Sequence, residues 1–143
     1  MKQRNITQVH SPTHHFSVLL SPTPRGARLA RLLAVEWMRD HEVPYGAAEA
    51  VTQVVAELAA NAATHGRVAG RSFRLALLRH EGALRIEVTD TRREDLPRVQ
   101  PVCTDGDSGR GLLLVEALAD RWGVGLGPVP RKTVWAELDL HHP

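Results

Sequence analysis

Glu57-Leu-Ala-Ala-Asn61-Ala-Ala-Thr-His65 is the stretch of this 143-residue chain that most constrains its fold. Three polar side chains recur every four residues, and the residues between them are mostly small or apolar. At 3.6 residues per turn, such spacing places the polar side chains in one stripe beside an apolar stripe. The apolar stripe consists of Val51, Val55, Leu58 and Ala62. The pattern predicts a helix over residues 44–65 that packs on a core and holds Glu57, Asn61 and His65 at its margin.

The chemistry of this margin admits two interpretations. A carboxylate and an amide held between core and solvent suit general-base work and coordination of a hard cation such as Mg²⁺. The same residues are also typical of an ordinary amphipathic helix with polar border positions. Glu57 and Asn61 alone do not decide between the two, so the interpretation depends on segments further along the chain.

A glycine-rich segment, Gly106-Asp-Ser-Gly109-Arg-Gly111, runs into an apolar stretch that begins at Leu112. The apolar spacing predicts a helix from Leu112 to near Gly123. Glycines let a ligand approach the backbone, and the free N–H groups and dipole at a helix start favour an anion such as phosphate. A plain loop followed by a capped helix explains the segment equally well. The Walker-type phosphate loop is excluded because its Gly-x-x-x-x-Gly-Lys-Ser/Thr spacing is absent.

The strand expected at residues 84–90 ends on an acidic residue. Alternation places Asp90 on the same face as Leu84, Ile86 and Val88. A carboxylate on an apolar face needs a hydrogen-bond donor. The exocyclic amine of a purine would satisfy Asp90, and so would a backbone N–H or an arginine. An aspartate that only starts a turn is the alternative.

Together these segments resemble the histidine-kinase-like (GHKL) ATPase superfamily. Glu57-x-x-x-Asn61 is similar to its N-box, Asp90 to the adenine-reading aspartate of the first glycine box, and Gly109-Arg-Gly111-Leu-x-Leu-Val115 to the second glycine box. Within the superfamily, the chain most resembles stand-alone anti-sigma-factor serine/threonine kinases and their actinobacterial relatives. Trp122-Gly-Val and Lys132-Thr-Val-Trp-Ala-Glu-Leu138 add to this likeness, which covers residues 16–140.

The resemblance implies a fold, cofactors and a set of site residues. The fold is α+β, a two-layer α/β sandwich whose mixed, mostly antiparallel sheet carries helices on one face, as in Bergerat-type ATP-binding domains. The cofactors are ATP and Mg²⁺, with Glu57 as the catalytic base and Asn61 as the metal ligand. The other residues that it implies for cofactor binding are His65, Asp90, Gly109, Arg110, Gly111, Leu112 and Thr133.

The implied activity is phosphorylation of an antagonist protein on serine or threonine, together with sequestration of a sigma factor or similar regulatory client. The resemblance also allows a homodimer. The superfamily's Asp-x-Gly-x-Gly is replaced here by Asp90-Thr-Arg92-Arg93-Glu, which favours a non-catalytic protein-binding module with weak or absent nucleotide binding. The intact Glu57 and Asn61 favour the enzyme. The catalytic domain of a split sensor histidine kinase is a further alternative.

Composition limits the remaining classes of function. A hydrophobic content of 43% is enough for one domain, which we expect at residues 16–143, after a flexible tail at residues 1–15. The formal charge of +2 is modest, so we do not expect a nucleic-acid ligand. A transducer domain or a dimerising hairpin is not expected in a chain of this length. Neither a signal peptide nor a membrane span is evident, and Cys103 is the only cysteine, so we expect a cytoplasmic protein.

The remaining elements follow from periodicity. We expect strands at residues 16–20, 72–78, 122–126 and 133–140, a helix at 24–40, and a lid at 91–108 that closes over bound nucleotide. Trp135 and Thr133 face away from the helices, so Trp135 is a candidate partner anchor and Thr133 is poorly placed for the pocket. The open face is expected to carry Arg74, Ala76, Leu78, Arg85, Glu87, Thr89, Trp135 and Glu137.

Overall fold

The computed structural model describes residues 14–65, 72–90, 107–126 and 132–140. Three helices and five strands occupy these ranges. In chain order they are β1 (His14–Leu20), α2 (Pro24–Asp40), α3 (Tyr45–His65), β2 (Phe73–His80), β3 (Ala83–Asp90), α4 (Asp107–Leu118), β4 (Arg121–Leu126) and β5 (Lys132–Asp139). Cys103 and the expected lid at 91–108 lie outside the described residues, apart from Asp107 and Ser108, which begin α4. The expected tail also lies outside them, except His14 and His15, which begin β1.

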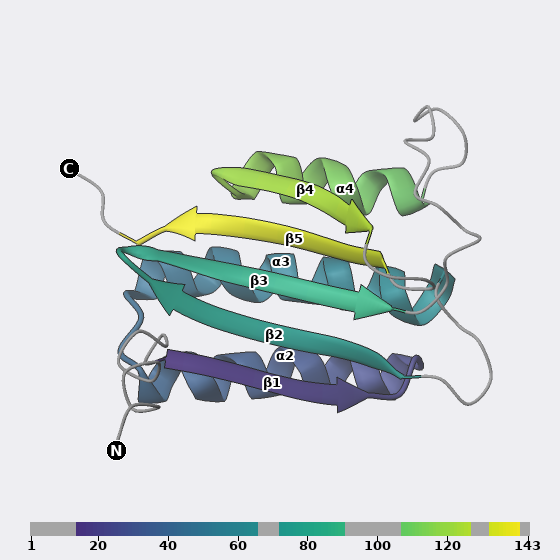
Figure 1. Ribbon diagram of the computed structural model, residues 1–143, viewed down its shortest axis with the longest axis horizontal. Coiled ribbons are helices and arrows are strands. Elements are labelled where there is room, and N and C mark those ends of the chain that lie inside the picture. Colours follow the sequence, from purple (N-terminus) through teal and green to yellow (C-terminus); the bar gives the residue numbers. More distant parts are fainter. Residues whose placement is uncertain (1–13, 66–71, 91–106, 127–131, 141–143) are drawn as a thin grey trace, which may run out of the picture.

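The strands form a single sheet in the order β1-β2-β3-β5-β4. Every pairing among them is antiparallel. The three helices lie side by side behind one face of this sheet, as Figure 1 shows. The two-layer α/β sandwich is therefore confirmed, with a described sheet that is antiparallel throughout.

Helix α3 lies at the centre of the helix layer. It contacts β2, β3 and β5 as well as both other helices. Its apolar stripe is buried, as predicted, because it faces the middle of the sheet. The α3 side chains that contribute to the core are Val51, Val54, Val55, Leu58, Ala59 and Ala62. The sheet contributes Phe73, Leu75, Leu77, Leu84, Ile86, Val88, Ala136 and Leu138.

Local chemistry sets the turns and the helix ends. The Thr23 hydroxyl accepts a hydrogen bond of 3.0 Å from the Gly26 backbone N–H, which caps the start of α2. The hairpin between β2 and β3 turns through Glu81 and Gly82, whose φ angles of 50° and 82° are both positive. Positive φ at both loop residues is typical of the type I′ turn, whose twist matches that of paired strands.

The third helix differs from the prediction at both ends. α4 begins at Asp107, so the glycine-rich segment forms its first turns instead of a loop before it. It ends at Leu118 instead of near Gly123. The cause of the earlier end is the sheet: the Asp120 backbone N–H donates to the Glu137 carbonyl at 2.9 Å, and β4 starts at the next residue.

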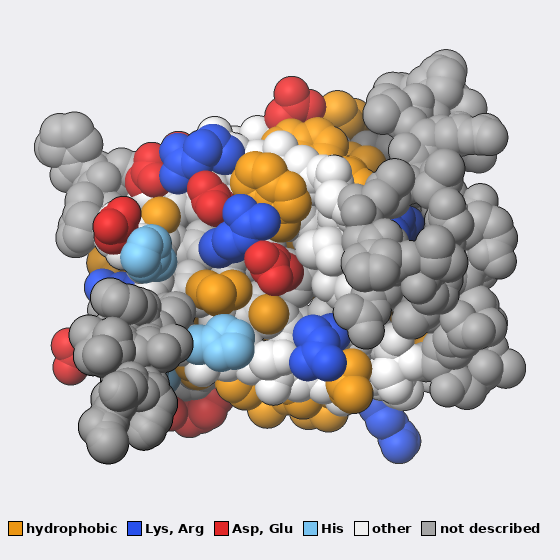
Figure 2. Space-filling model, in the orientation of Figure 1, with side chains coloured by type: hydrophobic (Ala, Val, Ile, Leu, Met, Phe, Trp, Pro, Cys, Tyr) orange, Lys and Arg blue, Asp and Glu red, His pale blue; other side chains and the backbone are white. Residues whose placement is uncertain are grey.

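The face of the sheet opposite the helices carries a network of ion pairs. Arg85 donates to Glu87 at 2.7 Å and to Glu137 at 2.8 Å, and Arg121 donates to Glu137 at 2.9 Å. The Arg85 guanidinium also lies 4.3 Å from the ring centre of Trp135. Acidic and basic side chains accordingly alternate over β3, β5 and β4 in Figure 2.

Trp135 faces outward, as predicted, but it is half-buried. Arg85 covers one side of its indole, and a Cβ added at Gly123 would lie only 2.9 Å from Trp135 Cζ2. The ring therefore lies flat between the arginine and the backbone of β4, an arrangement that explains an aromatic on this face without a partner protein. None of the helices in the described ranges is long and apolar enough to cross a membrane.

Gly26 and Gly46 offer a matched test of the packing at the start of α2. A Cβ at Gly26 would lie 1.9 Å from the backbone oxygen of Ser21, whereas a Cβ at Gly46 would meet nothing within 4 Å. We expect Gly26→Ala to lower the free energy of unfolding by about 1–3 kcal/mol because the backbone must move. Gly46→Ala, at an exposed helical position, should be neutral or stabilising by up to about 1 kcal/mol. Urea denaturation measures both, and equal effects would contradict the described packing.

Glu137 makes the fold sensitive to acid. Its pKa lies below the ordinary value of 4.5 because Arg121, and then Arg85, donate hydrogen bonds to its carboxylate. Such a carboxylate stabilises the folded state above its unfolded pKa, and the contribution is lost as pH falls through the folded pKa. The wild type should exceed Glu137→Gln in unfolding free energy at neutral pH, and the difference should shrink below about pH 4.5. Denaturation at several pH values tests this, and a difference independent of pH would contradict it.

Candidate functional site

Four segments that are distant in sequence meet at one end of the molecule. Figure 1 shows the last turn of α3, the end of β3, the first turn of α4 and the start of β5 at the right-hand end of the view. The helices α3 and α4 pack against each other. The topology therefore gathers most of the residues that the sequence singled out into one region.

Asp90 is the last residue of β3 and faces the helix layer. Its exposed fraction is 6%, and it continues the buried positions Leu84, Ile86 and Val88, as the alternation predicted. Lys132 lies directly opposite on β5 and is itself largely buried. The Lys132 Nζ atom is 3.8 Å from Oδ2 of Asp90, and this ion pair is one of the interactions of the carboxylate. A buried carboxylate needs such compensation.

Glu57 and Asn61 lie one turn apart on α3. Both are half-buried, while the neighbouring Leu58 and Ala62 belong to the core. The expected position at the margin of the core is therefore confirmed for these two residues. His65 is the final residue of α3, and the placement of its side chain lies outside the described part of the structure.

The first turns of α4 contain Gly109, Arg110 and Gly111, followed by the half-buried Leu112. The first N–H groups of any helix have no acceptor within the helix, and the helix dipole makes this end positive. The glycine-rich segment forms the start of α4 instead of a loop before it, and this helix start is still suited to binding an anion such as phosphate. The side chain of Arg110 is not among those that the structure describes.

Thr133 is not brought together with these residues. Its hydroxyl lies 2.7 Å from that of Thr89, with which it pairs across β3 and β5. Thr89 precedes Asp90 in the strand and therefore faces the opposite side of the sheet. The inward position at this end of β5 belongs to Lys132, which the sequence analysis did not select. The signal was available, because the alternation that turns Thr133 outward turns its neighbour inward.

The residues gathered here fit an adenine nucleotide with magnesium. Asp90 provides a buried acceptor of the kind that reads an exocyclic amine. Glu57 and Asn61 offer carboxylate and amide oxygens, which Mg²⁺ prefers, and Mg²⁺ usually takes its other ligands from phosphates and water. The start of α4 suits the phosphates themselves.

A separate hollow of about 590 Å³ lies between α2 and the first half of α3. It contains none of the residues discussed above. Its lining combines apolar and polar side chains, among them Val35, Met38, Tyr45, Thr52 and Gln53. It is therefore a different surface from the region around Asp90.

Comparison with known families agrees with this geometry. The sequence profile of the histidine kinase-like ATPase domain matches residues 20–135. The chain belongs to this family, whose members bind ATP, and the matched segment contains α2, α3, the Asp90 strand and α4. No curated protein matches the sequence detectably.

Solved structures share the fold at low sequence identity. One is the structure of the RsbU and RsbW domains of a Mycobacterium tuberculosis protein, with a TM-score of 0.70 and 20% identity over 93% of this chain. This chain spans about a third of that protein, since it covers 34% of its length. Another is the SiaB–SiaC complex from Pseudomonas aeruginosa, with a TM-score of 0.70, 12% identity, and coverage of 94% of this chain and 96% of the matched chain.

Because the Asp90–Lys132 pair is buried, we expect Asp90→Ala to lower the unfolding free energy much more than Glu36→Ala, which removes an exposed carboxylate. Asp90→Ala leaves the largely buried ammonium of Lys132 without this partner, and we expect a loss of about 3 kcal/mol in unfolding free energy. Glu36→Ala breaks an ion pair with Arg39 whose side chains are 61% and 68% exposed, and the expected loss is below about 0.5 kcal/mol. Chemical denaturation at pH 7 compares them, and similar losses would contradict the assigned burial.

Proposed function

We propose that this protein is an ATP-binding regulatory kinase of the anti-sigma-factor type. It transfers phosphate to serine or threonine of an antagonist protein and sequesters a sigma factor or similar client. The observation that supports this most strongly is the convergence of the buried Asp90, the margin of α3 and the first turn of α4 at one end of a histidine kinase-like ATPase domain.

Each site residue has a role in this proposal. Bound Mg·ATP would supply the phosphoryl group and neutralise charge that develops on it. Asn61 holds the metal through its amide oxygen, and Asp90 accepts a hydrogen bond from the exocyclic amine of adenine. The free backbone N–H groups in the first turn of α4, which begins at Asp107 and includes Gly109, hold the phosphates. Arg110, Gly111, Leu112 and His65 are further predicted cofactor contacts, whereas Thr133 faces the opposite side of the sheet.

Glu57 acts as the general base. A bond forms between the γ-phosphorus and the hydroxyl oxygen of the protein substrate, the bond to the β-phosphate oxygen breaks, and ADP leaves. The hydroxyl proton passes to the Glu57 carboxylate. A half-buried carboxylate on a rigid helix is suited to this task because the helix fixes its position.

The exposed side of α2 is our proposed docking surface for a protein partner. Arg25, Arg28 and Arg31 are exposed there together with Leu29 and Leu32. Such a surface suits a partner segment that combines acidic and apolar residues. The likeness to an RsbW domain and to a chain of the SiaB–SiaC complex supports regulatory protein partners.

A non-catalytic binding module is the second candidate. The replacement of the family's glycines by Arg92 and Glu94 favours it, because those glycines give the backbone clearance beside adenine in the family. Calorimetry with Mg·ATP separates the two candidates, since a module without a nucleotide site gives neither heat nor a shift in melting temperature.

Glu57→Gln tests the enzyme directly. The purified protein is incubated with Mg²⁺, γ-labelled ATP and candidate antagonist proteins from the same genome, and transfer of label is followed. We expect the substitution to lower the transfer rate by about a hundredfold or more while leaving ATP affinity nearly unchanged, because the base acts only in the chemical step.

Glu49→Gln is the matched control. Glu49 is an exposed glutamate on the same helix and is hydrogen-bonded to Tyr45. We expect the Glu49→Gln variant to transfer label at the wild-type rate. Undiminished transfer by Glu57→Gln would remove the proposed role of that residue. Wild-type protein that binds no Mg·ATP would refute the kinase proposal as a whole.

A further inference from the structure

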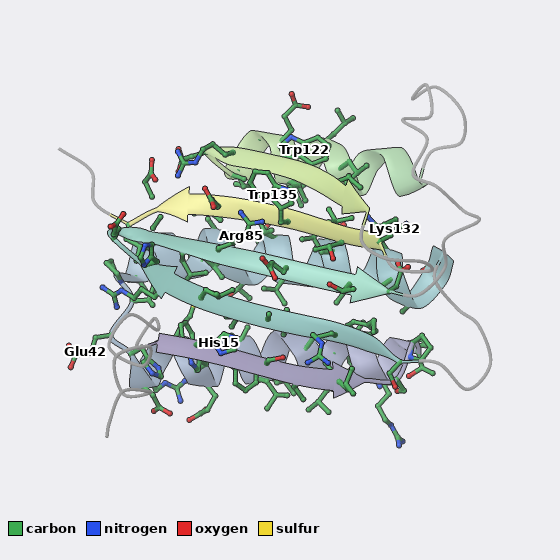
Figure 3. The ribbon with its side chains drawn as sticks, viewed as in Figure 1. His15, Glu42, Arg85, Trp122, Lys132 and Trp135 are labelled. Carbon is green, nitrogen blue, oxygen red and sulfur yellow. The ribbon has the colours of Figure 1, made fainter. Side chains whose placement is uncertain are left out.

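The start of β5 places a cation beside the carboxylate that the proposed function assigns to adenine. Lys132 and Asp90 are directly opposite in the register of β3 and β5. Their side chains are only 13% and 8% exposed. Figure 3 shows Lys132 at the right-hand end of β5, well away from the Arg85 and Trp135 cluster. Because this lysine shares the helix-covered face with Asp90, its ammonium belongs to the candidate site and not to the open surface.

We propose that Lys132 is a base-recognition residue, which donates a hydrogen bond to the ring nitrogen beside the adenine amine that Asp90 reads. The inference rests on the proposed nucleotide-binding function and deepens it. It assigns the site a paired donor and acceptor where the sequence pattern indicated an acceptor alone.

The distance between the two groups supports this role. The 3.8 Å separation of Lys132 Nζ from Asp90 Oδ2 is longer than a hydrogen bond, so the two charges are adjacent without a direct hydrogen bond between these two atoms. An ammonium has three donors and a carboxylate has about four acceptor positions. Lys132 therefore keeps donors for the edge of a ligand while it remains paired with Asp90.

The chemistry of adenine matches such a pair. Its Watson–Crick edge presents an amine that donates and, next to it, a ring nitrogen that accepts. A carboxylate satisfies only the amine. A neighbouring ammonium satisfies the ring nitrogen, so the two side chains together bind both groups on that edge.

The alternative is a lysine that serves only to position Asp90. Burial of an ammonium is costly, and the other residues of β5 on this face are Val134, Ala136 and Leu138, so a lysine here does require a reason. Compensation of Asp90 would be reason enough. The two roles differ in whether Lys132 affects a base that has no amine for Asp90 to read.

Purine riboside triphosphate provides this test, because it keeps the ring nitrogen of ATP and lacks the exocyclic amine. Affinities for ATP and for this analogue, each with Mg²⁺, are measured by calorimetry on the full chain. We expect Lys132→Met to weaken both nucleotides by about tenfold, since each loses a hydrogen bond to a charged donor. Asp90→Asn should weaken ATP and leave the analogue nearly unchanged. Arg85→Gln, which removes an ion-paired cation from the opposite face, should alter neither.

The outcomes separate the proposals. If Lys132→Met weakens ATP but not the analogue, the lysine only positions Asp90 and the inference is overturned. No effect on either nucleotide overturns it as well. If the wild type binds neither nucleotide, the proposed function itself fails.

A second comparison covers the case in which Lys132→Met does not fold. The double variant Asp90→Asn/Lys132→Met removes both buried charges, and it is compared with Asp90→Asn alone. We expect the double variant to bind both nucleotides about tenfold more weakly than the single one. Equal affinities of the two variants would contradict a contact between Lys132 and the base.

Discussion

The packing of α3 against the middle of the sheet is the constraint on which the rest of the structure depends. Val51, Val55 and Leu58 are almost fully buried against β2, β3 and β5, so the helix cannot rotate without exposing them. This fixes Glu57 and Asn61 at the border of the core. Since α4 packs on the same helix, α3 also sets where α4 lies relative to them. Hydrophobic burial thus determines where the polar chemistry of the site can occur.

The two faces of the sheet use charge in different ways. On the open face, Arg85 and Arg121 share Glu137 in a partly solvated network that covers Trp135. On the helix face, Asp90 and Lys132 form a pair that is largely removed from water. Solvated pairs add little to stability, and buried pairs are costly unless well compensated. A buried pair at the end of two strands is therefore better explained by ligand recognition than by stability.

Local pattern predicted much of this arrangement. Helix 24–40 has the predicted bounds, and the alternation in β3 correctly turned Asp90 inward. The start of α4 could not be predicted, because glycines weaken the helical signal and contact with α3 supports the helix. Alternation in β5 turns Lys132 inward, but its pairing with Asp90 depends on the register between β3 and β5, which joins segments about forty residues apart and has no local signature. His65 remains a prediction as a cofactor contact, whereas Thr133 lies on the opposite face of the sheet.

The most direct test of the account is a crystal structure with magnesium and a non-hydrolysable ATP analogue. We expect the base at Asp90 and Lys132, the metal on Asn61, and the phosphates at the first turn of α4. Nucleotide bound in the hollow between α2 and α3, or absent from the region between α3 and α4 at saturating concentration, would contradict it.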